Sequence, residues 1–184
     1  MALFSKTSPN PQEGGKTKVQ KMTADTANKT IKNLQAEINA LLQEEAKART
    51  YSYSPGEEPD PPAYDFVATQ DRLDTLRDQI SVLRHAINQF NVNHRLEKLD
   101  GITLDEALRK MSVKHADKKR LFEMLQIPER DRVRSFGGRD ADYVCRNFDK
   151  AAVKAAYDYV SNELMLIQQE INIANLTETL VVDF

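Results

Sequence analysis

The sequence lacks tryptophan, contains a single cysteine and has no long apolar run. One cysteine, Cys145, excludes an intrachain disulfide and a metal cage built from cysteines. No stretch approaches the roughly 20 apolar residues of a membrane helix, and no signal peptide is recognisable, so a soluble protein is expected. The formal net charge of −2 gives no overall attraction to nucleic acid or to an acidic membrane surface, and neither is expected as a partner.

Known catalytic motifs are also missing. The three histidines, His85, His94 and His115, lack the spacings of metal-binding motifs, and no glycine-rich phosphate loop or nucleophile elbow occurs. We therefore expect a protein that is not an enzyme, with no catalytic residue, no bound metal and no cofactor.

The apolar residues that are present recur at alternating spacings of three and four, the pattern of amphipathic helices. This spacing predicts helices from Thr23 to about Thr50, from about Phe66 to the Asn-rich segment near residue 90, from Leu104 to about Gln126, and after Asp149. Thr103 and Glu106 match a capping box, and Asp149 matches an N-cap residue. The expected fold class is mainly α, a four-helix antiparallel bundle or coiled coil in a single domain over residues 22–180. Residues 1–21 are expected to form a flexible tail, and residues 181–184 a short C-terminal tail.

Two segments that connect the predicted helices have a distinct composition. The loop between the first and second helices holds four prolines, so it cannot continue a helix, and it also holds the carboxylates Glu57, Glu58 and Asp60. Between the third and fourth helices, a Gly-Gly pair within residues 131–148 predicts a small β-hairpin that is rich in arginine, including Arg132, Arg134 and Arg139. These arginines could bind phosphate. In an up-down-up-down bundle, however, the hairpin lies beside the acidic loop, and mutual neutralisation, within or between subunits, is the favoured interpretation.

The segments INQFNVNHRL (87–96) and INIANLTETL (171–180) share one polar pattern. An up-down-up-down order brings both to the same end of the bundle. Three interpretations remain open. The amides could satisfy helix ends, which is the favoured structural interpretation; they could line a polar ligand pocket; or they could form a subunit contact. The candidate ligand-binding residues here are Asn88, Asn91, Asn93, His94, Asn172, Asn175 and Thr177.

The run from Ile87 to Leu108, the ending INIANLTETL and the Gly56-Glu57-Glu58-Pro59 loop resemble the septicolysin family of small bacterial and phage proteins. The resemblance covers roughly residues 22–180. The family name implies a cytolysin, which is disfavoured because the sequence has no export signal and no surplus of apolar surface for entering lipid. A phage origin would imply a cytoplasmic protein of the host cell that sequesters a signalling nucleotide.

Together these features predict a non-enzymatic, homo-oligomeric helical protein of the cytoplasm that binds a small anionic or nucleotide-like ligand. The expected site combines the Asn segments with Arg132, Arg134 and Arg139, if oligomerisation brings the two regions together. The alternative is a structural scaffold or adaptor built on coiled-coil oligomerisation, whose ligand is another protein.

Overall fold

The computed structural model describes residues 19–134 and 141–183 of the 184-residue chain. The protein is mainly helical. Its elements, in chain order, are β1 (Val19–Thr23), α1 (Ala24–Ala48), α2 (Phe66–Asn93), β2 (Arg95–Leu96), the 3-10 turn η1 (Glu97–Leu99), β3 (Ile102–Thr103), α3 (Leu104–Gln126), β4 (Arg130–Arg134), β5 (Ala141–Cys145), α4 (Lys150–Thr177) and β6 (Thr179–Asp183).

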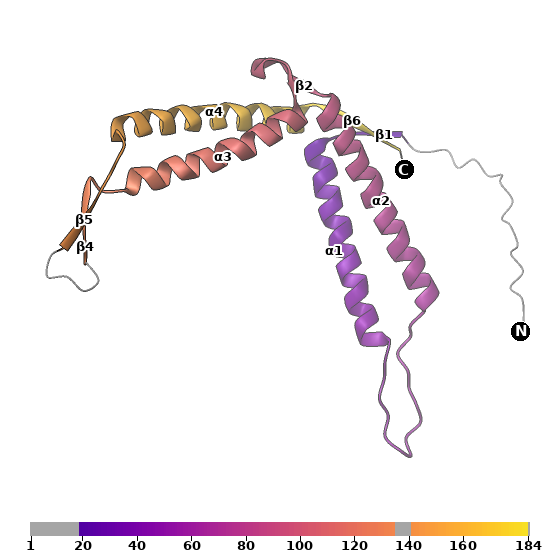
Figure 1. Cartoon of the computed structure of the whole chain (residues 1–184). Coiled ribbons are helices and arrows are strands. Elements are labelled where there is room, and N and C mark those ends of the chain that lie inside the picture. Colours follow the sequence, from indigo (N-terminus) through magenta and orange to yellow (C-terminus); the bar gives the residue numbers. More distant parts are fainter. Residues whose placement is uncertain (1–18, 135–140, 184) are drawn as a thin grey trace, which may run out of the picture.

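The four helices are paired as two antiparallel hairpins that diverge from a common junction (Figure 1). One arm consists of α1 and α2, and its core is formed by Ile38, Leu73, Leu76 and Ile80. The other arm consists of α3 and α4, and its core is formed by Leu121, Val153, Val160 and Leu164. Each arm is therefore only two helices thick and buries one apolar stripe per helix.

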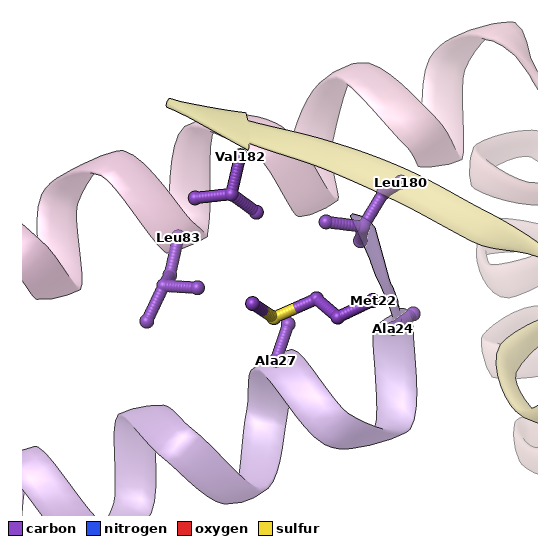
Figure 2. Close-up of a cluster of buried hydrophobic side chains, with 6 residues drawn as sticks. All are labelled: Met22, Ala24, Ala27, Leu83, Leu180 and Val182. Atoms are coloured by element: carbon purple, nitrogen blue, oxygen red, sulfur yellow. The ribbon is translucent and has the colours of Figure 1, made fainter. Parts of the chain in front are cut away.

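The junction holds two further clusters of buried side chains. In the first, strand β6 lies across α1 and α2, and Leu180 and Val182 face Met22, Ala27 and Leu83 (Figure 2). The second cluster joins the β2–β3 segment and the start of α3 to the end of α4, through Leu96, Leu104, Ala107, Ile167, Ile171 and Ala174. Phe90 of α2 packs against both clusters and so connects the two arms.

The expected single bundle is therefore replaced by two separate helix pairs. The apolar stripes are where the 3-4 spacing predicts them, and the up-down order of the helices is retained. Those stripes, however, fit equally well against one neighbouring helix or against three, because the spacing specifies only a face. Here the β1–β6 and β2–β3 pairs occupy the junction and pack on the helix ends, and the far halves of the arms do not share a core.

Both predicted tails are shorter than expected, because the tail residues nearest the helical domain form β-strands. Val19–Thr23 pairs with Thr179–Asp183 in antiparallel register, Met22 opposite Leu180. Residues 19–21 and 181–183 therefore belong to the folded domain. The pairing is stable because alternate residues of β6, Leu180 and Val182, are buried against the helices while their neighbours face outward. Residues 1–18 lie outside the described part of the chain.

The predicted helix signals are confirmed in detail. Thr103 Oγ1 accepts a hydrogen bond from the amide of Glu106, and a carboxylate oxygen of Glu106 accepts from the amide of Thr103 at 2.7 Å. These are the two reciprocal bonds of a capping box. Asp149 caps α4 by accepting from the amide of Ala151 at 2.8 Å. The turn before α3 places Asp100 at φ 58° and Gly101 at φ 69°, a conformation that favours glycine at the second position.

The Arg-rich hairpin is confirmed as an antiparallel pair, with Arg132 opposite Tyr143. Its predicted neutralisation by the acidic loop within one chain is wrong. The hairpin lies at the tip of the α3–α4 arm, whereas the loop between α1 and α2 lies at the tip of the other arm (Figure 1). Because the arms diverge from the junction, the hairpin and the loop lie at the ends of different arms.

Candidate functional site

Polar side chains from three helices surround two adjoining clefts at the junction of the arms. The first cleft, of about 250 Å³, is lined by Asn172, Asn175 and Leu176 of α4 together with Asp25 and Asn28 of α1. The start of α1 and the end of α4 meet here because strands β1 and β6, which adjoin these helix ends, pair with each other. The amide groups on α4 therefore face a helix that lies more than 120 residues away in sequence.

The second cleft shares Asn28 with the first. It has a volume of about 400 Å³ and is lined by Asn28, Ile31 and Lys32 of α1 and by Arg84, Ile87 and Asn88 of α2. We call the six polar residues Asn28, Lys32, Arg84, Asn88, Asn172 and Asn175 the amide notch. Both clefts are open to solvent, so a ligand could enter without movement of the backbone.

The charge of the notch is positive on the side of the first arm. Among the residues that the structure describes, Lys32 and Arg84 form no ion pair, and no carboxylate lines the 400 Å³ cleft. The one carboxylate in the smaller cleft, Asp25, is paired with Lys29 at 2.7 Å. Guanidinium and ammonium groups without a local partner attract anions, and side-chain amides add both donors and acceptors.

A third cleft extends this surface along the first arm. It has a volume of about 440 Å³, and its lining includes Arg84, which it shares with the notch, and also Arg77, Gln35 and Asn39. Its lining also holds no carboxylate, although Arg77 is paired with Asp74 at 3.0 Å. Arg84 therefore lies between two clefts on α1 and α2 whose linings combine polar side chains with isoleucine and leucine side chains.

The structure brings some of the sequence-predicted residues together and separates others. Asn88, Asn172 and Asn175 lie at the notch, as the shared polar pattern predicts. Asn91 is half-buried and lines none of these clefts. The amide of Asn172 is partly occupied, because its Oδ1 accepts a hydrogen bond from Gln168 at 2.9 Å.

Three predicted residues have local roles at helix ends instead. Asn93 Nδ2 donates to the carbonyl of Gln89 at 2.8 Å, and Thr177 Oγ1 donates to the carbonyl of Ile173 at 2.8 Å. The ring of His94 stacks on that of Phe90, with 4.9 Å between the centroids, and its backbone amide closes α2. For these positions the structural interpretation, that polar groups satisfy the last turn of a helix, is the one that the contacts support.

Strand β4, which carries the described arginines Arg130 and Arg132, lies away from the notch within one chain. Arg132 is exposed on β4, at the far end of the arm whose near end carries Asn172 and Asn175. Arg134 ends the same strand, and Arg139 lies outside the described residues. The hairpin is held locally by Arg130, whose guanidinium lies 3.5 Å from the ring centroid of Tyr143.

Sequence reasoning missed the contribution of the first arm to the site. Asn28 and Lys32 are four residues apart on α1, and so are Arg84 and Asn88 on α2, and each pair therefore lies on one helix face. The start of α1 is expected at the same end of the fold as the Asn segments, so this spacing could have identified these residues. Asn28, Lys32 and Arg84 lie outside the two segments that share the polar pattern.

A separate groove of about 360 Å³ lies between α2 and β6. It is lined by Val82, His85, Ala86, Gln89, Phe90, Asn93 and residues 180–183. Its polar lining residues are His85, Gln89, Asn93 and Asp183. Among the described residues, no lysine or arginine lines this groove, so it is a weaker candidate for an anionic ligand than the amide notch.

Comparison with known proteins identifies the fold but no function. No family model and no curated protein matches the chain. A crystal structure described as that of a functionally unknown conserved protein from Corynebacterium diphtheriae is similar, with a TM-score of 0.62 and 18% sequence identity. The match covers 88% of this chain and 99% of that one. At this identity the similarity shows a shared fold. In the described part of the chain, no helix is both long and apolar enough to cross a membrane.

Proposed function

We propose that this protein is a non-enzymatic, homo-oligomeric binding protein whose amide notch holds a small anionic, nucleotide-like ligand. The observation that carries the proposal is the convergence of Asn28, Asn88, Asn172 and Asn175 beside two cations that have no carboxylate partner among the described residues. Amides recognise the hydrogen-bonding edges of a base or sugar, and the two cations attract phosphate. The site has no set of acid, base and nucleophile, so binding rather than chemistry is proposed.

The amide notch differs from the site expected from the sequence in the source of its positive charge. Its cations are Lys32 and Arg84, which lie beside the amides, so the Arg-rich hairpin is not required within one chain. The combined volume of the two clefts is in the range of small-molecule sites, about 300–1,000 Å³. If the chain is phage-encoded, as its resemblance to the septicolysin family suggests, sequestration of a host signalling nucleotide is the role that we propose for it.

Native mass spectrometry of the protein purified from cells, followed by calorimetry with a panel of cyclic and linear nucleotides, tests the proposal. We expect one nucleotide class to bind, and we expect Arg84→Ala and Asn28→Ala to raise its Kd by about tenfold or more, because each removes a hydrogen bond to a charged or polar ligand group. Asn91→Ala and Arg132→Ala are the matched controls and leave the Kd unchanged. Binding that Arg84→Ala and Asn28→Ala leave intact would place the ligand elsewhere.

A second candidate function is a scaffold or adaptor whose ligand is another protein. It is favoured by the exposed apolar side chains on α4, which include Met165 at 62% and Leu166 at 53% exposure. Surfaces of this kind mark protein contacts. A purified oligomer that carries no small molecule and binds none of the nucleotides supports the scaffold over the ligand-binding protein.

A further inference from the structure

Helix α4 carries a buried apolar stripe on one face and an exposed stripe without charged residues on another. The inner stripe, which includes Val160, Leu164, Ile167 and Ile171, is buried in the arm and the junction. The second stripe, here called the outer stripe, follows the same alternation of three and four: Ala152, Ala155, Tyr159, Asn162, Leu166, Gln169, Ile173 and Leu176. All eight of these residues are exposed. At about 100° per residue, most of the outer stripe lies on the side of α4 that faces away from the inner one. Its last residue, Leu176, also lines the 250 Å³ cleft beside α1.

The spacing of the outer stripe is that of a coiled-coil seam. It extends over 25 residues, about 36 Å of helix at 1.5 Å per residue, and Asn162 and Gln169 are its two polar positions. Four exposed large apolar residues of α4 lie on it, namely Tyr159, Leu166, Ile173 and Leu176. The exposed large apolar residues of α1, α2 and α3 form no comparable series; Val113 and Phe122, for example, are nine residues apart on α3. A seam of this kind fits another helix with the same periodicity, rather than a flat surface or a small molecule.

The distribution of charge indicates which helix fits. None of the five charged residues of α4 falls in the outer stripe. Glu163 and Glu170, which lie beside the stripe, are held by lysines of the same chain, Lys114 at 2.5 Å and Lys98 at 3.0 Å. Asp158 is held by Lys154 at 2.5 Å. Two α4 helices can therefore approach each other without repulsion between like charges, whereas a strongly charged partner helix would find no counter-charge.

The order of side-chain sizes indicates the orientation. The small residues Ala152 and Ala155 are at one end of the stripe, and the large residues Ile173 and Leu176 are at the other. In an antiparallel pair of α4 helices, Ala152 faces Leu176, Ala155 faces Ile173, and Tyr159 faces Gln169 of the second copy. In the central layers, Asn162 faces Leu166. Small residues against large ones fill the layers of Ala152 and Ala155 evenly. A parallel pair would stack alanine on alanine at one end and leave that end thin.

We propose that the outer stripe is the dimer interface of this protein. At this interface, α4 of a second copy packs antiparallel across a two-fold axis that crosses the stripe at the level of Leu164 along the helix. The interface is isologous, so each substitution in the stripe acts twice. This inference specifies the homo-oligomer of the proposed function. It does not depend on the identity of the ligand, and it is tested on the ligand-free protein.

Sedimentation velocity over a concentration series, with the full chain, tests the interface. We expect a monomer–dimer equilibrium whose dissociation constant rises by about tenfold or more in Leu166→Lys and in Ile173→Lys, because a buried lysine finds no partner there. Val113→Lys is the matched control, since Val113 is 63% exposed on the neighbouring helix, and it leaves the equilibrium unchanged. Circular dichroism verifies that each variant is folded. A wild type that is monomeric throughout, or a dimer that Leu166→Lys and Ile173→Lys leave intact, overturns the proposal.

Cysteine cross-linking in a Cys145→Ser background tests the orientation. Ala155→Cys and Ile173→Cys, oxidised separately, are expected to stay uncross-linked, because equivalent positions in an antiparallel pair are about 27 Å apart. A mixture of the two proteins is expected to yield a disulfide between positions 155 and 173, identified by mass spectrometry. Efficient cross-linking of Ala155→Cys alone, with none in the mixture between 155 and 173, would show a parallel pair and overturn the antiparallel assignment.

Discussion

Lys114 of α3 and Glu163 of α4 form an ion pair across the second arm, with Nζ 2.5 Å from Oε2. Both side chains are only 22% exposed, so the pair is less screened by water than the other ion pairs of the protein. The hydrogen bond from Lys114, helped by nearby positive charge, lowers the pKa of Glu163 below its ordinary value of 4.5. The same bond raises the pKa of Lys114 above 10.5. The pair thus links the two helices of the arm in a manner that depends on pH.

Lys114→Ala is expected to lower the Tm by about 1–3 °C between pH 5 and 10. The Glu163 contribution is present above its ordinary pKa and is lost as the pH falls through its lower folded value. The Lys114 contribution is present below 10.5 and is lost as the pH rises through its higher folded value. Calorimetry across pH therefore shows the difference between wild type and variant shrinking at both extremes. Lys119→Ala, which removes an exposed pair 4.0 Å apart, is the control and shows a smaller difference.

Phe90→Ala is expected to destabilise the protein by about 2 kcal/mol, because Phe90 packs against both junction clusters and its removal leaves a cavity between them. Urea unfolding measures the loss. Small-angle scattering of the folded variant is expected to show a wider distribution of the angle between the arms. Val67→Ala, at a site that is 64% exposed on the same helix, changes neither quantity. An unchanged scattering profile in Phe90→Ala would mean that other contacts set the angle.

Val182→Ala is expected to cost about 1–2 kcal/mol, since Val182 is 1% exposed beneath the β1–β6 pair. Its neighbour Val181 is 53% exposed on the other face of the same strand and serves as a matched control. Val181→Ala is expected to cost less than about 0.5 kcal/mol. Equal effects of the two substitutions in urea unfolding would contradict the observed face of β6.

Thr103→Ala is expected to cost about 1 kcal/mol, because it removes the N-cap of α3 and leaves the amide of Glu106 without its partner. Thr75→Ala in the middle of α2 is the control. Thr75 Oγ1 bonds only to a carbonyl of its own helix, so its loss is nearly neutral in urea unfolding. A cost for Thr103→Ala no greater than that of the control would show that the capping box does not stabilise the helix.

Much of the local structure could be predicted from the sequence because it depends on neighbours within a few residues. The capping box at Thr103, the N-cap at Asp149 and the bounds of α3 are set by contacts two to four positions away. Part of the candidate site could be predicted for the same reason, since Asn172 and Asn175 share a helix face. The contribution of Asn28 could not be predicted, because its approach to α4 depends on the pairing of two strands at opposite ends of the chain.

The sequence by itself determined four amphipathic helices, their direction along the chain and the turns that end them, because a 3-4 stripe and a cap are local properties. Only the tertiary structure decided that the stripes pair two by two, that β6 joins β1 over the junction, and that residues 19–134 and 141–183 leave the outer stripe of α4 exposed. A stripe specifies that a face must be buried but not which surface buries it. That choice depends on competition among all apolar surfaces of the chain at once.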